Sequence, residues 1–342
     1  MPRIRQQDLA DALGVHVTTV SKALKNHPGV AAATRTRVQE AAERMGYRPD
    51  PMLQSLVAYR QRNVAPAYRA TLAWFCNYPE GTDMRIHAGY EDYLLGAREE
   101  AARLGYRLDV FHNPGAPEDP APVLRTVRAR GIRGIVMAPQ ARPGLEIQGD
   151  LSAFSVVTIG FTLKAPRFHL VTNDHFGTML AMLERVRDLG YKQPGAYLSE
   201  VDNHRMGRRA RGALESVSRE HRVPVLRYEK ASRKGFLDWL RRHPRMDALI
   251  TREARAAAWL CQAGRRLPVF NYALPSPLVS GPGMYHNNRR IGGAAIDLLA
   301  RLIDRNETGI PESPLRVMLE SLWVAPDANP RTFHARDTVT IS

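Results

Sequence analysis

A short run near the N-terminus combines helical periodicity with side chains that can hydrogen-bond to nucleic acid. In GVHVTTVSKALKNHPGV, residues 14–30, the apolar Val20, Ala23 and Leu24 recur at helical spacing. The opposite face carries Val17, Thr18, Ser21 and Lys22. Lysine can donate to O6 and N7 of guanine, and the methyl groups of threonine and valine can touch the thymine methyl group. The stretch therefore predicts a helix whose polar face contacts DNA bases.

Three predicted helices hold this face in place. The periodicity predicts helices over residues 6–13, 16–25 and 32–45. Gly14 ends the first helix, because glycine takes a positive φ without strain. Two short helices joined by a glycine turn form a helix-turn-helix, whose second helix fits the major groove. An ordinary amphipathic helix with a solvated polar side is the alternative for the second helix.

No residue pattern predicts catalysis or a bound cofactor. The chain has no G-x-G-x-x-G after its first predicted strand, and no P-loop, G-x-S-x-G or H-E-x-x-H motif. Several histidines are scattered without a paired nucleophile, namely His87, His112, His169, His175, His204 and His286. Cys76 and Cys261 lack metal-ligand spacing and are predicted to be buried, reduced thiols. We therefore expect no enzyme, no metal site and no cofactor.

The composition is that of a soluble chain with two or three domains. The length of 342 residues exceeds that of one ordinary domain. The formal net charge is +15, but 43 arginines against 6 lysines, spread along the chain, indicate a compositional bias as well as attraction to polyanions. No apolar run has the length of a membrane span, and the N-terminus lacks a signal-peptide core, so we expect a cytoplasmic location.

From Thr71 onward, apolar strands alternate with amphipathic helices. The predicted strands are TLAWFC, YRLDVFH, IRGIVMAP, SVVTIGF, PGAYLS, MDALIT and LPVFNY, with a last strand between Leu315 and Val324. The helices between them include one over about 204–220 and the long NRRIGGAAIDLLARLIDRN. Continuous apolar strands separated by helices indicate parallel sheets covered on both faces. The length of this region and a break near Asn173 predict two α/β lobes.

These patterns divide the chain into a helix-turn-helix headpiece, a hinge helix with a linker, a two-lobed core and a C-terminal tail, over residues 1–49, 50–69, 70–330 and 331–342. In the hinge, Asp50 suits an N-cap and Pro51 the first helical position. A helix of about eight residues is marginal alone in water, so we expect it to order only against DNA and a second copy. A plain linker whose Leu56 packs on the core is the alternative.

Four segments, DLADALGV, TTVSKALKN, VAAATRTRVQEAAERMGYRP and QSL, lie within the first 60 residues. They resemble the DNA-binding region of the LacI/GalR (lactose-repressor) family of transcriptional regulators. Position by position, the resemblance implies base contacts from Val17, Thr18 and Lys22, with His16 and Thr19 as weaker candidates. It implies phosphate contacts from Ser21 and Asn26. It also implies that Leu56 wedges into the minor groove at the centre of a palindromic operator.

Two positions depart from the family pattern. Leu53 stands where members usually have a small residue, at the meeting point of two hinge helices, so it widens the hinge pair or adds a second apolar wedge into DNA. Ala31 stands where the third helix usually begins with a serine cap. Because a lost cap costs about 1 kcal/mol, we expect a headpiece that is loosely ordered without DNA.

The segments GAREEAARLGYRLDV, RGIRGIVMAP and IGGAAIDLLARLI resemble the family's effector-binding and dimerisation core, a two-lobed sensor related to periplasmic sugar-binding proteins. Arg209 falls where the family has an arginine that reaches into the cleft between the lobes, and a guanidinium can grip a carboxylate or vicinal hydroxyls. Its neighbours are predicted to form a solvated face, namely Arg205, Arg208 and Arg211. Asn173 and Asp174 are further effector-binding candidates, with turn capping as the alternative.

The expected cleft has lost acidic residues that sugar-binding members use. Gly160 and Ala273 stand where many members carry an aspartate, and the usual Asn-Asp after the strand MDALIT is absent, with Arg252 and Glu253 nearby. Fewer carboxylates leave fewer acceptors for sugar hydroxyls. The pattern therefore favours an anionic or less hydroxylated effector.

Together, the residues and the resemblance predict a transcriptional repressor that binds double-stranded DNA as a homodimer. Its effector would be a sugar, a sugar derivative or an anionic metabolite, and no membrane would be involved. No leucine-heptad run ends the chain, which favours a dimer over a tetramer. The alternative is a DNA binder that needs no effector, or one that depends on a protein co-repressor.

Overall fold

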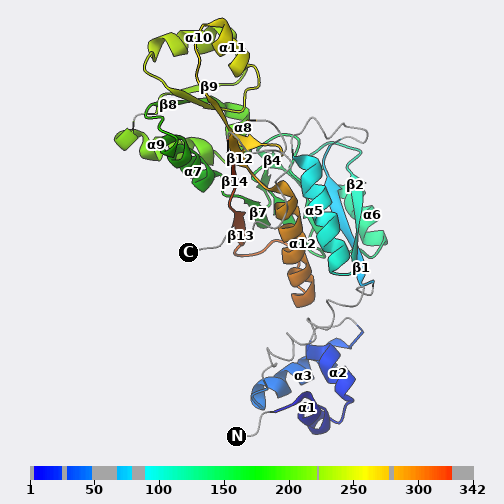
Figure 1. Cartoon of the computed structure of the whole chain (residues 1–342). Coiled ribbons are helices and arrows are strands. Elements are labelled where there is room, and N and C mark those ends of the chain that lie inside the picture. The colour runs from blue at the N-terminus through cyan, green and yellow to red at the C-terminus, as the bar shows by residue number, and fades with distance from the viewer. Residues whose placement is uncertain are drawn as a thin grey trace.

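The computed structural model describes residues 4–24, 29–47, 68–78, 89–221, 223–276 and 281–325. Within these ranges the chain forms an N-terminal unit of three helices and an α/β core of two lobes (Figure 1). Each lobe contains one sheet of six strands with helices on both faces. This arrangement confirms the predicted fold class.

The three-helix unit consists of α1 (Gln6–Leu13), α2 (Val17–Leu24) and α3 (Ala32–Arg44). Its small core is built from the apolar stripe of each helix, namely Leu9, Ala10, Val20, Ala23, Val38, Ala41 and Ala42. Gly14 adopts a left-handed φ of 64° and ends α1, as predicted. The following Val15 N–H donates to the Ala10 carbonyl at 3.1 Å, which closes the turn between α1 and α2.

The start of α3 lacks a side-chain cap. Ala31 occupies the N-cap position with an extended backbone, and its methyl group accepts no hydrogen bond from the first turn. The first turn of α3 also carries no acidic residue that would interact favourably with the helix dipole. The structure therefore confirms that α3 begins without a side-chain cap, as the sequence predicts.

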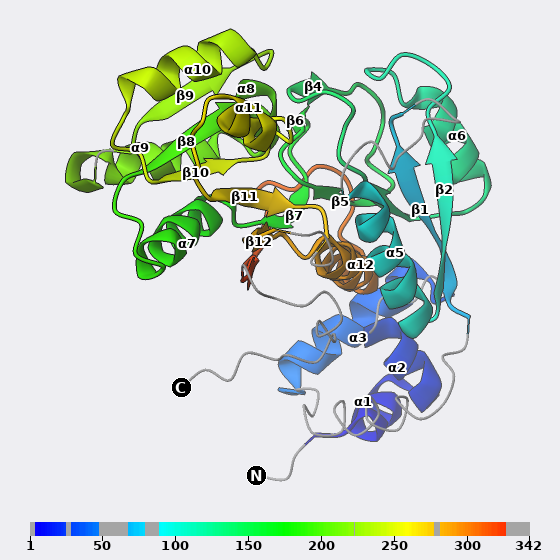
Figure 2. The same ribbon diagram turned by 45° about the horizontal axis from the view of Figure 1, so that its top comes forward.

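Lobe 1 is a parallel sheet in the order β13-β7-β5-β3-β1-β2. Its strands are β1 (Ala70–Cys76), β2 (Tyr106–His112), β3 (Gly134–Met137), β5 (Ser155–Ile159), β7 (His169–Asn173) and β13 (Arg316–Leu319). One face is covered by α5 (Tyr90–Arg103) and α12 (Asn288–Arg305), and the other by α6 (Ala121–Ala129). A separate pair of short strands, β4 (Leu145–Glu146) and β6 (Leu163–Ala165), lies beside this sheet (Figure 2).

Lobe 2 has the strand order β14-β12-β11-β10-β8-β9 and is parallel except for β14. Its strands are β8 (Pro194–Ser199), β9 (Val225–Tyr228), β10 (Ala248–Thr251), β11 (Val269–Leu274), β12 (Gly283–Tyr285) and β14 (Leu322–Val324). One face packs against α7 (His175–Asp188) and α9 (Arg209–His221), and the other against α10 (Arg233–Arg242) and α11 (Ala256–Gln262). The short α8 (Glu200–Arg205) follows β8.

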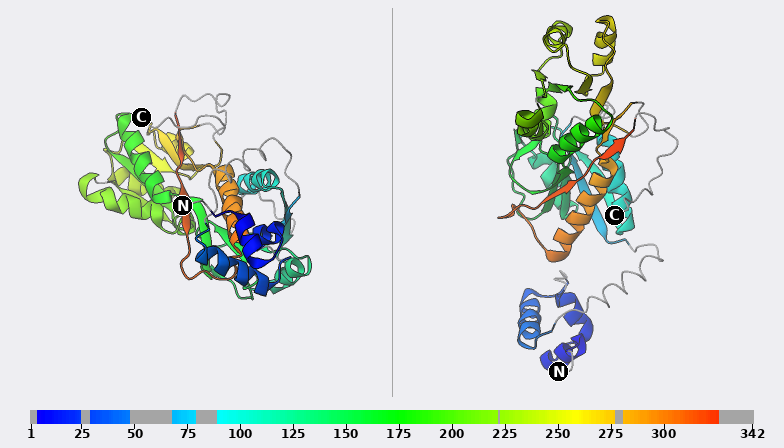
Figure 3. Two further views of the ribbon diagram at one scale, coloured as in Figure 1. Left: turned by 90° about the horizontal axis from the view of Figure 1, so that it is seen from below. Right: turned by 60° about the vertical axis from the view of Figure 1, so that its left-hand side comes forward.

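The chain passes between the lobes three times. It leaves lobe 1 after β7, returns from β12 to α12, and passes back from β13 to β14. The last crossing runs as one extended ribbon along both lobes, drawn in red in the right-hand view of Figure 3. The predicted break near Asn173 is therefore the first of three crossings, and Asn173 is the last residue of β7.

Close packing of α12 against α5 depends on two glycines. A Cβ atom at Gly96 would collide with the backbone carbonyl of Arg289, and one at Gly292 would collide with that of Tyr93. Both helices therefore approach each other backbone to backbone, and Figures 1 and 2 show them side by side. This contact holds α12 on lobe 1, although α12 follows a strand of lobe 2.

Several predicted elements need correction. The predicted helix over about 204–220 is two helices, α8 and α9, because Gly207 and Arg208 both adopt a positive φ and break it. The predicted last strand is also two strands, β13 and β14, which belong to different sheets. The prediction also missed some elements altogether, namely β4, β6, β7, β9, β12 and α10.

The two cysteines differ in burial. Both thiols are free, and Cys76 is buried as predicted, whereas Cys261 is exposed on the side of α11 that faces solvent. The prediction of a buried thiol at Cys261 was therefore wrong. Among the residues that the structure describes, no helix has the length and apolar character needed to cross a bilayer.

Restoring the cap of α3 tests the effect of Ala31 on the headpiece. A serine hydroxyl at this extended N-cap position can accept a hydrogen bond from the first turn, so Ala31→Ser should stabilise the headpiece by about 1 kcal/mol. Hydrogen exchange of α3 amides in the full-length protein should then slow by roughly fivefold. Ala33→Ser, two residues into the same helix, is the matched control. Equal exchange rates in both variants would show that the missing cap does not limit headpiece order.

Candidate functional site

The predicted DNA-reading face lies on the outer side of α2. Val20 and Ala23 are fully buried against α1 and α3, which turns the opposite side of the helix outward. Of the candidates on that side, His16, Thr18 and Lys22 are exposed, and the half-buried ones are Val17, Thr19 and Ser21. The helix therefore presents a contiguous polar surface on a packed support, which is the geometry that base contacts require.

His16 begins α2 and also shapes its first turn. Its carbonyl accepts hydrogen bonds from the Thr19 and Val20 N–H groups at 2.8 and 3.2 Å. The Thr18 N–H donates to His16 Nδ1 at 3.3 Å, and the Thr18 hydroxyl lies 2.8 Å from the same nitrogen. His16 and Thr18 thus fix each other's orientation at the N-terminal end of the predicted reading face.

Three of the predicted DNA contacts, Asn26, Leu53 and Leu56, lie outside the described residues. The same holds for the predicted hinge residues Asp50 and Pro51. Their roles stay predictions from the sequence.

The second candidate site is the lobe junction. We define it by Phe161 of lobe 1 and by five residues of lobe 2 and its crossings, namely His175, Arg205, Arg209, Arg252 and His286. Of these, His175 and Arg209 lie against the Phe161 ring. Arg209 begins α9, and its guanidinium carbon lies 4.2 Å from the centre of the Phe161 ring. Its Nη1 donates to the Gly207 carbonyl at 3.4 Å. Burial and the nearby Arg316 lower the pKa of Arg209, whereas Asp174 raises it. Arg209 therefore joins the two lobes, and its role as an effector contact stays a prediction.

Arg205 does not lie on a solvated face. Its Nη1 donates to the carbonyl oxygens of Gln140 and Ala141 at 3.1 and 3.0 Å, and both acceptors lie beyond the end of β3 in lobe 1. The prediction for Arg205 was therefore wrong, because its shortest hydrogen bonds are to backbone atoms, which no residue type reveals. Its neighbour Arg211 does face outward, where it pairs with Glu215 at 2.6 Å.

Arg252 is a third cation at the junction. It forms an ion pair of 3.1 Å with Asp202 of α8, and both side chains are about a quarter exposed. Burial raises the pKa of Tyr93 on α5 to about 12, and the nearby Arg205 and Arg252 lower it. Both guanidinium groups therefore lie near Tyr93. The carboxylate of Glu253 is already occupied, because it forms an ion pair of 2.6 Å with Arg255.

Two buried histidines sit among these cations. The ring centres of His175 and His286 are 5.1 Å apart, and His286 Nε2 lies 3.1 Å from the Tyr272 carbonyl oxygen. Burial, together with the positive charge of Arg252, lowers the pKa of His286 to about 3. Burial also lowers the pKa of His175 well below its usual range, with contributions from His286, Arg209 and Arg252. Both rings are therefore neutral at physiological pH.

Asn173 and Asp174 have structural partners. The Asn173 amide donates to the Leu319 carbonyl at 3.0 Å and to the Ser321 hydroxyl at 2.8 Å, and its oxygen accepts from the Thr178 hydroxyl at 3.0 Å. Asp174 caps α7 by accepting from the Gly177 N–H at 3.0 Å. The Asp174 contact matches the capping alternative, whereas Asn173 bonds to the segment between β13 and β14 instead of capping a turn. Their role as effector contacts stays a prediction.

Gly160 and Ala273, which stand where many family members have an aspartate, lie in different backbone settings. Gly160 adopts a φ of 72°, and its N–H donates to the Val171 carbonyl at 3.1 Å. Ala273 is buried within β11. Neither position supplies a carboxylate to the junction. Within the described part of the chain, no cluster of three or more histidine, cysteine, aspartate or glutamate side chains could hold a metal ion.

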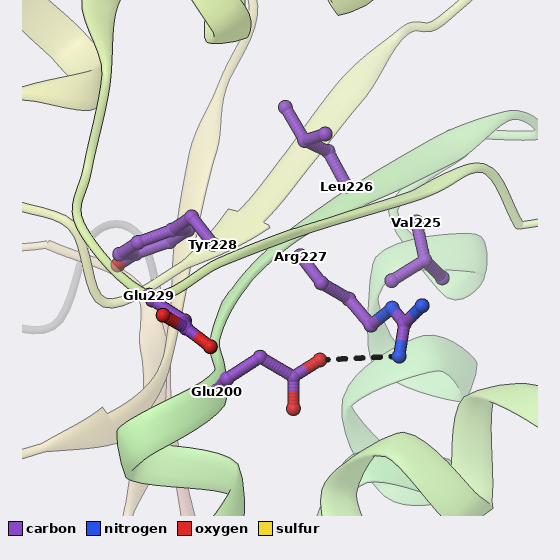
Figure 4. A pocket seen from close by; sticks show the side chains of 6 residues that line it. All are labelled: Glu200, Val225, Leu226, Arg227, Tyr228 and Glu229. Atoms are coloured by element: carbon purple, nitrogen blue, oxygen red, sulfur yellow. Dashed lines mark ion pairs between the residues drawn. The ribbon is translucent and has the colours of Figure 1, made fainter.

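Two surface cavities lie away from the junction. One, of about 560 Å³, lies along the edge strand β9 and is lined by Glu200 and residues 225–229, with an ion pair of 3.3 Å between Arg227 and Glu200 (Figure 4). The other, of about 490 Å³, lies near the C-terminal end of α12 beside His169. We place the candidate effector site at the junction instead, because the charged and buried polar groups gather there.

Comparison with known proteins identifies the family. Residues 6–50 match the description "Bacterial regulatory proteins, lacI family". Residues 83–267, more than half of the chain, match "Periplasmic binding proteins and sugar binding domain of LacI family". The chain belongs to the LacI family. This family consists of regulators, which confirms that the chain is not an enzyme.

One curated transcriptional regulator also resembles the chain. The HTH-type transcriptional regulator AglR of Rhizobium meliloti (strain 1021) is 32% identical over 194 residues, which is 56% of this chain and 51% of AglR. The chain thus spans about half the length of this curated relative.

Two solved structures share the LacI-family fold. A transcriptional regulator CelR–cellobiose complex matches with a TM-score of 0.53 at 16% identity, over 94% of this chain and 99% of CelR. A LacI-family regulator from Rhizobium etli matches with a TM-score of 0.57 at 11% identity, over 76% of this chain and 98% of that one.

The neutral histidines predict an acid-sensitive core in this LacI-family protein. An unfolded histidine takes up a proton near pH 6.5, whereas folded His286 does so only near pH 3, so its contribution to stability is full above pH 6.5 and is lost as the pH falls toward 3. At pH 5 the loss from His286 is about 2 kcal/mol.

Urea unfolding at pH 7.5 and pH 5.0 measures this loss. His286→Gln should lose about 2 kcal/mol less than the wild type between the two pH values. The exposed His204 provides the control, since His204→Gln removes an imidazole outside the buried pair. An unchanged pH dependence in His286→Gln would contradict the assigned neutral state.

Proposed function

We propose that this LacI-family chain is a cytoplasmic transcriptional repressor that binds a near-palindromic operator as a homodimer. The observation that carries the proposal is the reading face of α2, where Thr18 and Lys22 are exposed while Val20 and Ala23 anchor the helix. A headpiece of this size reads one half-site, so two copies related by two-fold symmetry read a palindrome. The net charge of +15 favours binding to a polyanion, and binding should weaken steeply with salt.

A small-molecule effector at the lobe junction would control DNA binding. The effector is a sugar, a sugar derivative or an anionic metabolite. Side chains from both lobes meet at the junction, so a bound molecule can favour one relative orientation of the lobes over another. A ligand shifts such an equilibrium only by its difference in affinity for the two orientations.

One observation favours the alternative of an effector-independent DNA binder. Arg205 already joins the lobes through the Gln140 and Ala141 carbonyls. Saturable stabilisation of the protein by a small molecule separates the two functions, because an effector-independent binder shows none.

Selection of the full-length protein against random DNA tests the proposed function. The expected result is an enriched two-fold symmetric site of roughly 14–20 base pairs with half-sites about one helical turn apart. An enriched site without two-fold symmetry would rule out the homodimer on a palindrome. Failure to enrich any sequence, with or without candidate effectors, would count against sequence-specific binding.

Lys22→Ala tests the reading face itself. Loss of a lysine that donates to a base should reduce discrimination at one position of each half-site by about 1–3 kcal/mol, with little change at the others. Ser21→Ala is the matched control, because loss of a phosphate contact should weaken all sequences alike. Binding to the selected site and to single-base variants can be measured by fluorescence anisotropy at fixed salt. Unchanged base preference in Lys22→Ala would show that α2 is placed differently on DNA.

A further inference from the structure

We infer that the effector carries a carboxylate or phosphate group that binds the Arg209 guanidinium at the lobe junction. This inference rests on the proposed function and names the chemical class of its effector. It depends on three features of the junction: an excess of hydrogen-bond donors, an uncompensated positive charge and a buried nitrogen that has no partner.

The junction has many donors and few free acceptors. A guanidinium donates up to five hydrogen bonds and accepts none. Arg205 donates to two lobe 1 carbonyls, and Arg252 is paired with Asp202. Arg209 donates only to the Gly207 carbonyl, at the long distance of 3.4 Å. Among the described residues it forms no ion pair, so most of its donors are open to the oxygens of a ligand.

The charge around Arg209 is unfavourable without an anion. Arg209 is the first residue of α9, where the helix dipole is positive, and Arg208 precedes it. Arg316 of β13 is close enough to lower the pKa of Arg209. The carboxylate of Asp174 is near enough to raise the pKa of Arg209, but it accepts a hydrogen bond from the Gly177 N–H and caps α7. A bound anion would offset this charge in a partly buried place, where the interaction is stronger than in bulk water.

A buried nitrogen lies beside the same site. His175 is 9% exposed, and its Nδ1 has no hydrogen-bonding partner among the described residues. Its ring centre lies 6.1 Å from that of Phe161, on which Arg209 stacks. A buried polar atom without a partner is unfavourable by about 1–3 kcal/mol. Arg209 lies close enough to lower the pKa of His175, so we assign the missing partner to the ligand that Arg209 holds.

Stacking on Phe161 alone would explain the position of Arg209 without any ligand. A cation over an aromatic face is a stabilising contact in itself. The two explanations differ in one measurable way, since only a ligand site makes stability depend on the concentration of particular anions. They also differ in what they require of the guanidinium group. Only a ligand site needs its planar pair of donors, which lysine does not reproduce.

The test measures the melting temperature of the full-length protein by its tryptophan fluorescence at fixed ionic strength. The probes are inorganic phosphate, acetate, glucose 6-phosphate and glucuronate, with glucose as the uncharged parent. Arg209→Gln removes the charge, and Arg209→Lys keeps the charge but loses the fork. Arg211→Gln is the matched control, because Arg211 lies on the same helix and pairs with Glu215 instead.

The expected result is a saturable rise in melting temperature with at least one of the four anions and none with glucose. The apparent affinity should fall at least tenfold in Arg209→Gln, less in Arg209→Lys, and not in Arg211→Gln. The phosphate and acetate series decide between the two anionic groups. An anion effect of equal size in the wild type and Arg209→Gln would overturn the inference. So would a glucose effect as large as that of its anionic derivatives, or no effect from any of the four anions.

Operator binding separates failure of this inference from failure of the proposed function. The melting experiments contain no DNA, so they report on the junction alone. If the wild type binds its selected DNA site but no anion acts through Arg209, the proposed effector class is wrong. The proposed DNA-binding function then still holds. If no DNA site is selected while an anion stabilises only proteins with Arg209, the junction site stands and the proposed regulator fails.

Discussion

The buried amide of Asn173 ties together two of the three segments that join the lobes. It lies at the end of β7 and bonds to Leu319 and Ser321, on the segment that leads from β13 to β14. The Thr178 hydroxyl contacts both Asn173 and Ser321, so the start of α7 belongs to the same network. Because an unpaired buried amide is unfavourable by 1–3 kcal/mol, these bonds resist separation. Rotation of the lobes about this tied pair is the motion that leaves the network intact.

Given that constraint, the contacts further from the crossings decide how the lobes are oriented. Arg205 and Arg209 both reach from lobe 2 to lobe 1, one to carbonyl oxygens and the other to the Phe161 ring. Their different targets follow from the break between α8 and α9, where Gly207 and Arg208 turn the backbone through a positive φ. An unbroken helix would place the two side chains one turn apart on one face. The break therefore gives two separate contacts between the lobes at one junction.

Much of the fold follows from periodicity, and the failures have physical causes. The strands β1 and β2 are found at or within a residue of their predicted ranges, because each has a long apolar pattern. In contrast, β7, HLVTN, has polar residues at both ends that are buried only because neighbouring segments bond to them. The run from Leu315 to Val324 has no glycine or proline, so nothing local marks the change from one sheet to the other. For the candidate site, Arg209 was found through the family resemblance. Arg205 was missed because its partners are main-chain carbonyls.

The histidines show why the charge at the junction matters beyond Arg209 itself. Burial keeps His175 and His286 neutral, and Arg209 and Arg252 add to this effect because a second positive charge nearby is unfavourable. An anion on Arg209 would reverse part of that repulsion and make protonation of His175 easier. Because linkage is reciprocal, protonation of His175 would in turn tighten the anion. The proposed binding of an anion at Arg209 would therefore be coupled to the protonation of His175.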